Sequence, residues 1–396
     1  MAWSSIVDWI APGGHMRDMM NNSWYHELYG DAYNLPFDIA YKLWDIIAGL
    51  LAWILDLLLP NNGISRFLVS DGTMVGGALI LFMLIIFIVC FVWTLICLWE
   101  ERKVLGRLMD RRGTMIGMKG FLQCVADGLK TFMKENTLPA KIDKMGYMWT
   151  LSLVIGVSVL VACMVPLSDR WFVVGYDTGL LIIMAFYAMA PFFILVSGWA
   201  QNNKYSMIGG IRAAEMMISY EVPMLIVIAT AALLAGSFNI NVIVDAQKDI
   251  WYLFPMFIGF VTFGICAIAE AERVPFDLAE AEAELVEGWQ TEYAGMKWGL
   301  IMLGDYFRGG VSCMMIVILF LGGWNIPFVP DAWNDVLPEI VFLIKTGFTF
   351  FVIIVIRGAL ARVRMDQIVN LGWKIFMPLS VINLAVVLLL KMGGIY

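Results

Sequence analysis

The sequence VGGALILFMLIIFIVCFVWTLICLW (residues 75–99) contains no charged side chain. An α-helix of about 20 apolar residues crosses a hydrocarbon core of roughly 30 Å, so this run predicts a membrane-spanning helix. The rest of the chain has a similar character, with 61% hydrophobic residues and a mean hydropathy of +0.80. We therefore expect an all-α, polytopic membrane protein and exclude the soluble classes.

Further apolar windows follow the first along the 396-residue chain. Together they predict about eight transmembrane helices, near residues 75–99, 147–166, 178–200, 217–236, 250–269, 296–321, 338–357 and 372–391. Residues 75–396 then form the membrane domain, and residues 1–74 an N-terminal extension. The extension has an apolar piece, LWDIIAGLLAWILDLLLP (residues 43–60), which Asp45 and Asp56 interrupt. It is short for a span, so we expect a helix in the membrane interface or against the bundle, with a ninth span as the alternative.

Basic residues gather in the loops on one side of the predicted bundle. The loop 100–146 holds ten Lys or Arg residues, whereas the loops on the opposite side hold Arg170 and Lys248. Because cytoplasmic loops collect Lys and Arg, the basic side is predicted to be cytoplasmic. The segment KGFLQCVADGLKTFMKE (residues 119–135) on that side has one broad apolar face, which favours an amphipathic helix in the interface plane.

Composition also bears on the possible ligands. The net charge is −7 and no basic stripe is visible, which argues against nucleic acid as a partner. The two histidines, His15 and His26, lie in the polar N-terminal region, and the six cysteines are scattered through apolar runs. We therefore expect no metal centre and no redox cofactor bound by this chain alone.

Acidic residues are concentrated in EAERVPFDLAEAEAELVEGWQTEY (residues 270–293), which places eight carboxylates around Arg273. Asp277 as N-cap and Glu280 three residues later predict a helix that ends at Gly288. A solvated acidic helix is the simplest interpretation. The adjoining span and the alanine-rich faces instead favour a partly buried cluster, whose coupled pKa values would be raised toward neutrality.

Other charged residues are predicted within the spans. Glu221 lies near the start of the fourth span, and a carboxylate there costs about 2.5 to 3.5 kcal/mol on insertion scales, which favours a functional role. Asp305 of the sixth span either forms a local salt bridge with Arg308 or belongs to a proton path. Lys345 of the seventh is either a relay member or a counter-ion.

Five longer stretches resemble, in order, the motifs of one family. They are ERKVLGRLMDRRG (101–113), GFLQCVADGLKTFMKE (120–135), NNKYSMIGGIRAAEMMISYE (202–221), AERVPFDLAEAEAELVEGWQTEYAGM (271–296) and RVRMDQIVNLGWKIFMPLS (362–380). The chain is similar to the quinone-site membrane subunit of respiratory complex I, the H-type subunit of bacteria, including its archaeal and hydrogenase-linked relatives. The similarity extends from about residue 74 to the end.

The resemblance implies eight tilted helices whose cytoplasmic loops seal a narrow chamber. It implies a non-redox subunit of a proton-translocating NADH (or other donor):quinone oxidoreductase, which lines the quinone channel and couples quinone reduction to proton translocation. The acceptor would be ubiquinone, menaquinone or methanophenazine, held at the interface with partner subunits. The partners would be iron-sulfur and quinone-site subunits of the peripheral arm, small membrane-arm subunits and antiporter-like subunits. The location would be the prokaryotic cytoplasmic membrane.

The resemblance also implies roles for individual residues. The quinone channel would be lined by Glu101, Arg102, Arg111, Arg273, Phe276 and Asp277. The proton path would contain Glu221, Glu270, Glu272, Glu280, Glu282, Glu284 and Asp305. The loop 357–366, with its several arginines, is expected to have a structural or docking role.

The chain departs from the family pattern at three places. GTMIGM (residues 113–118) lacks the two prolines that the family has there, Glu272 replaces an Asn, and Glu215 replaces a small residue. The loop change leaves the identity of the acceptor open. The main alternative is the homologous subunit of a membrane-bound hydrogenase or formate-oxidising ion-pumping complex, without quinone. A stand-alone transporter or a structural anchor are further alternatives.

Overall fold

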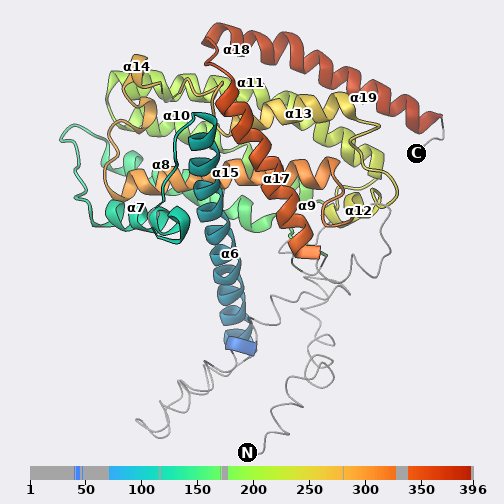
Figure 1. Cartoon of the computed structure of the whole chain (residues 1–396), viewed down its shortest axis with the longest axis horizontal. Coiled ribbons are helices and arrows are strands. Elements are labelled where there is room, and N and C mark those ends of the chain that lie inside the picture. Colours follow the sequence, from blue (N-terminus) through green and yellow to red (C-terminus); the bar gives the residue numbers. More distant parts are fainter. Residues whose placement is uncertain are drawn as a thin grey trace, which may run out of the picture.

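The computed structural model describes residues 40, 42–44, 47, 71–115, 117–169, 171, 177–279, 281–326 and 338–393, and the regular elements in these ranges are all helices. Figure 1 shows these helices packed against one another in a bundle. This confirms the predicted all-α class. The apolar piece of the N-terminal extension lies almost entirely outside the described residues.

Among the described residues, seven helical segments are long and apolar enough to cross a membrane. They are α6 (Asp71–Leu108), α8 (Lys144–Met164), α9 with α10 (Gly179–Tyr187 and Ala190–Ala200), α11 (Lys204–Ala235), α15 (Met296–Phe320), α17 (Pro338–Ala359), and the run of α18 (Met365–Leu371), η3 (Gly372–Phe376) and α19 (Met377–Met392). The chain is therefore a multi-pass membrane protein, and seven of the predicted spans are confirmed.

The element predicted at residues 250–269 differs from the prediction. Here α13 (Phe257–Glu270) is only 14 residues long, because residues 252–256 form turns after α12 (Ile240–Asp245). The Gln247 side chain joins these turns to the end of α15, since its oxygen accepts from the N–H groups of Tyr252 at 3.4 Å and Gly322 at 3.1 Å, and its amide donates to the Ile318 carbonyl at 2.8 Å. A polar anchor therefore replaces the first turns of the expected span.

Two prolines shape the helices beside the buried acids. Pro191 has no N–H to bond the carbonyl of Tyr187. The helix is therefore interrupted between α9 and α10. Pro223 lies inside α11, two residues after Glu221, and cannot bond the carbonyl of Ser219. A Cβ added to Gly372 would lie 2.8 Å from the same Ser219 oxygen. Glycine therefore allows η3, which is a π-helical turn, to approach α11 closely.

Helix α15 runs through the middle of the bundle and packs against α8, α17, α13 and α6 (Figure 1). Its apolar window is 89% buried, the largest fraction of any of the seven segments. Charged side chains in the middle of α15 are therefore removed from solvent and from the surrounding membrane. This is the environment in which Asp305 and Arg308 lie.

The two helices predicted in the loops between spans, one amphipathic and one acidic, had different outcomes. The amphipathic helix is confirmed as α7 (Phe121–Met133), with Leu129, Phe132 and Met133 exposed. The acidic helix predicted from Asp277 to Gly288 is wrong in extent, because only α14 (Glu282–Leu285) forms, with no side-chain N-cap. The segment before it is instead held by tertiary contacts, including a hydrogen bond from the Val363 N–H to the Pro275 carbonyl at 3.2 Å.

Lys345 of α17 is a hydrogen-bond donor to backbone carbonyls. Its ammonium donates to the carbonyl oxygens of Leu321, Gly323 and Asn325 at 2.7, 2.9 and 2.6 Å. These groups follow the end of α15, where carbonyls have no partner within the helix. Of the two interpretations of Lys345, the structure supports the counter-ion.

We expect Lys345→Met to destabilise the protein by about 1 to 3 kcal/mol, because it leaves half-buried carbonyls without a donor. Thermal unfolding of the purified assembly in lipid nanodiscs would measure the change. Lys141→Met is the matched control, since Lys141 is exposed. Equal unfolding temperatures for the two variants would contradict this role.

Candidate functional site

Glu101 is the centre of a buried ionic cluster on the polar side of the bundle. It lies near the end of α6 and is only 6% exposed. One of its oxygens, Oε1, contacts Nη1 of Arg273 at 3.4 Å and also Nη1 of Arg357. The guanidinium of Arg273 also stacks over the ring of Tyr306, 4.4 Å from its centroid. Segments far apart in the chain therefore meet at a single carboxylate.

The neighbouring wall contains Phe276 and Asp277. Asp277 accepts a hydrogen bond from Arg362 at 2.9 Å. The ring of Phe276 is buried and lies 5.3 Å from the ring of Tyr220, which itself donates to the Ile368 carbonyl. The structure thus brings the predicted channel residues Glu101, Arg273, Phe276 and Asp277 into one region.

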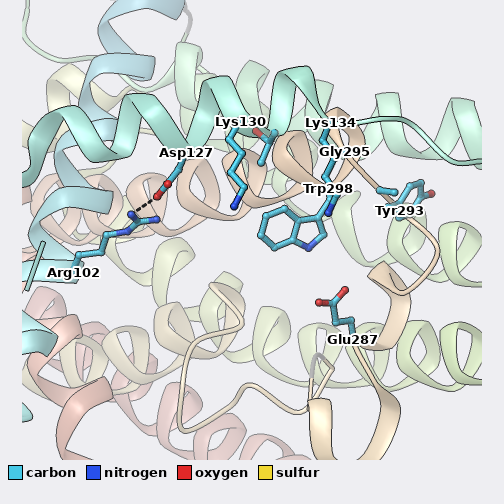
Figure 2. A pocket seen from close by; sticks show the side chains of 10 residues that line it. Arg102, Asp127, Lys130, Lys134, Glu287, Tyr293, Gly295 and Trp298 are labelled. Atoms are coloured by element: carbon cyan, nitrogen blue, oxygen red, sulfur yellow. Dashed lines mark hydrogen bonds and ion pairs between the residues drawn. The ribbon is translucent and has the colours of Figure 1, made fainter. Parts of the chain in front are cut away.

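Arg102 points to a different place from Glu101. It pairs with Asp127 of α7, and both residues line a cavity of about 400 Å³ between α7 and the start of α15. Figure 2 shows Lys130 and Lys134 extending from α7 toward the indole of Trp298, with the carboxylate of Glu287 opposite. Arg111 is exposed and lines neither this cavity nor the Glu101 cluster. The predicted channel set is therefore divided, with Arg102 at the cavity, Arg111 at neither place and the other four residues around the Glu101 cluster.

A row of buried carboxylates lies deeper in the bundle. Glu270 is 1% exposed, Glu272 4%, Asp305 7% and Glu221 8%. Electrostatic interactions join Asp277 to Glu272, Glu272 to Glu270, and Glu270 to Glu221. The row therefore leads from the wall that contains Asp277 into the helices α13 and α11.

The carboxylates in this row differ in their partners. Asp305 accepts a hydrogen bond from Arg308 at 2.5 Å, and Glu272 lies 3.5 Å from the same nitrogen. Among the described residues, neither oxygen of Glu270 or of Glu272 has a hydrogen-bond partner, and Oε1 of Glu221 also lacks one. A buried ionised carboxylate without partners is costly. Glu270, Glu272 and Glu221 are therefore the members best suited to carry a proton.

Glu272 lies outside the helices, in the turn after α13, with a left-handed φ of 49°. Burial raises the pKa of its carboxyl to about 7, against the opposing effect of the Arg308 charge, and Asp305 and Asp277 add to the increase. It can therefore exchange a proton near neutral pH.

The remaining predicted acids lie elsewhere. Glu284 is exposed and accepts a hydrogen bond from Arg212 at 2.6 Å. Glu282 begins α14, and Glu280 lies outside the described residues. The structure thus separates Glu284 from the buried row, and the roles predicted for Glu280 and Glu282 stay predictions.

Sequence reasoning missed three features of the site. Arg357 was expected in a structural or docking loop, but it shares Glu101 with Arg273. Tyr187 was not identified, although its hydroxyl lies 2.6 Å from that of Ser312 inside the bundle. The sequence pairs Arg308 only with Asp305. Its contact with Glu272 joins two distant segments, and nothing in the local sequence indicates it.

Comparison with known proteins identifies the family. The family model described as NADH dehydrogenase matches residues 80–388. The H subunits of NADH-quinone oxidoreductase from Bacillus thuringiensis (strain Al Hakam), Bacillus cereus (strain AH187) and Bacillus anthracis (strain CDC 684 / NRRL 3495) are each 40% identical to this chain over 298 residues. The matched region covers 74% of this chain and 87% of each relative. With its multi-pass helical fold and its buried ionic site, this chain belongs to the NADH dehydrogenase family of membrane subunits.

Proposed function

We propose that this chain is the membrane subunit of a complex I-type respiratory oxidoreductase that lines the acceptor channel and couples reduction of a quinone to proton translocation. The observation that carries the proposal is the row of carboxyl groups from Asp277 through Glu272 and Glu270 to Glu221, in which each group interacts electrostatically with the next. The names of the relatives, which are H subunits of NADH-quinone oxidoreductase, support the same reaction.

The acceptor would bind beside Arg273, Phe276 and Asp277, with its route lined by Glu101, Arg102 and Arg111. An arginine can donate hydrogen bonds to a quinone oxygen and stabilise the negative charge that develops on it. Glu101 and Tyr306 fix the Arg273 guanidinium in place for this role. The quinone would lie at the interface with partner subunits, and electrons would arrive from their iron-sulfur centres, since this chain is proposed to act without a redox centre of its own.

Coupling would be electrostatic. Reduction changes the charge beside Asp277, and that change alters the proton affinity of Glu272, the nearest buried acid of the row. Glu270 and Glu221 would then pass the proton toward the membrane axis. Peripheral-arm subunits would close the chamber, while small membrane-arm and antiporter-like subunits would continue the path in the prokaryotic cytoplasmic membrane.

We expect Glu221→Gln to reduce proton pumping strongly in the complete assembly reconstituted in vesicles, because an amide cannot bind and release the proton. The ratio of protons moved to electrons transferred is the measurement. Glu215→Gln is the control, because Glu215 lies on the same helix and is exposed. An unchanged ratio in Glu221→Gln would overturn the proposed coupling role.

We expect Arg273→Gln to raise the apparent KM for the quinone by roughly 10-fold, the effect of losing a charge-assisted hydrogen bond. Steady-state reduction of soluble ubiquinone, menaquinone and methanophenazine analogues by the intact assembly would measure it and would also identify the acceptor. Arg212→Gln is the matched control, since Arg212 pairs with the exposed Glu284. An assembly that reduces none of these analogues but evolves hydrogen would support the hydrogenase-type alternative instead.

A further inference from the structure

Arg308 is a buried cation shared by two carboxylates from different parts of the chain. It is 2% exposed and lies on α15, one turn after Asp305. Its Nη2 atom lies 2.5 Å from Asp305 Oδ1 and 3.5 Å from Glu272 Oε2. Its Nη1 atom contacts the sulfur of Met217 at 3.9 Å, and its Nε has no hydrogen-bond partner among the described residues. The guanidinium therefore favours Asp305 but remains within reach of Glu272.

Charges around Arg308 do not balance. Asp305 on α15, Glu272 in the turn after α13 and Glu270 on α13 all interact with this one cation. Two further groups lie close by, since Tyr187 of α9 interacts with Arg308, and Glu221 of α11 interacts with Glu270. Asp277 adds another negative charge that acts on Glu272. Asp277 is paired with Arg362, but one guanidinium cannot compensate Asp305, Glu272, Glu270 and Glu221 together. At least one of these four must therefore hold a proton to avoid the cost of an unpaired buried charge.

The charge of Arg308 itself is fixed, because a guanidinium does not lose its proton in proteins. What can vary is whether its hydrogen bond goes to Asp305, as in this structure, or to Glu272, which it contacts only as an ion pair at 3.5 Å. The carboxylate that it favours is stabilised as the anion, and the other is left partly compensated. At the observed distances, Glu272 is the partly compensated member.

We propose that Arg308 is a positioning residue that controls Glu272: by binding Asp305 more closely, it leaves the Glu272 carboxylate only partly compensated, so that Glu272 takes and releases the proton passing between the acceptor chamber and Glu270. This inference rests on the proposed function, because it assigns a direction to proton movement. In this proposal the proton enters the row at Glu272, and Asp305 stays ionised and paired with Arg308.

The proposal predicts shifts of opposite sign for two substitutions. Arg308→Gln removes the cation that lowers the pKa of Glu272, so Glu272 should hold its proton to higher pH. Asp305→Asn removes a repelling charge and frees Arg308 to pair with Glu272, so Glu272 should lose its proton at lower pH. A neighbouring charge shifts a carboxyl pKa by about 1 to 3 units, so we expect each midpoint to move by about one unit or more.

Infrared absorption of the protonated carboxyl C=O group, followed against pH in the complete assembly, would measure the midpoints. Glu272→Gln identifies the Glu272 signal, because that variant lacks it. In the unmodified assembly, we expect the Glu272 signal to have its midpoint near pH 7, in line with its pKa of about 7. Should Arg308→Gln fail to assemble, Asp305→Asn still tests the sign, since an amide keeps the size of the side chain.

Shifts in the same direction for both substitutions, no shift in either, or an upward shift in Asp305→Asn alone would overturn the control of Glu272 by Arg308. The titration needs neither electron transfer nor pumping. Its result can therefore be read whether or not the proposed function holds. Opposite shifts combined with unchanged pumping in Glu221→Gln would support the control by Arg308 and overturn the coupling role. Lost pumping in Glu221→Gln without the opposite shifts would support the coupling role and overturn the control by Arg308.

Discussion

Ionised groups inside an apolar bundle are costly unless they are paired, and this cost shapes the centre of the molecule. Glu101, Arg273 and Arg357 share their charges in one cluster, and Asp305, Arg308 and Glu272 do so in another. Each cluster draws its members from several helices or loops. The ion pairs therefore fix the relative positions of α6, α13, α15 and α17 as well as the chemistry of the site, while Glu270 remains without a hydrogen-bond partner among the described residues.

Irregular backbone occurs in the helices that carry or adjoin Glu221. Pro191 separates α9 from α10, Pro223 follows Glu221 within α11, and a π-helical turn begins at Gly372 beside Ser219. Such features are tolerated in membrane helices when they are packed against protein rather than lipid. They interrupt the helical hydrogen bonds of α9 with α10 and of α11, and they allow η3 to approach α11 closely.

The sequence predicts the spans well because an apolar run of membrane length has few alternatives to a helix. It predicts the span at 250–269 less well, since the side-chain anchor Gln247 acts through tertiary contacts that hydropathy does not register. The acidic helix fails for a similar reason, because packing overrides local propensity around Pro275. Buried Glu221 and Glu270 could be identified as chemically unusual. Their partners could not, since Glu101 and Arg357 are separated by 256 positions.

Glu101 and Arg102 are consecutive residues near the end of α6, yet they serve different sites. One joins the arginine cluster, and the other lines the cavity beside α7. Successive residues of an α-helix point about 100° apart, so the phase of α6 determines which side chain faces which site. Deleting or inserting a single residue upstream in the membrane would rotate both groups away from their partners at once. A rigid rotation of α6 about its axis would likewise disturb both sites together, which makes this helix a mechanical link between the outer cavity and the inner cluster.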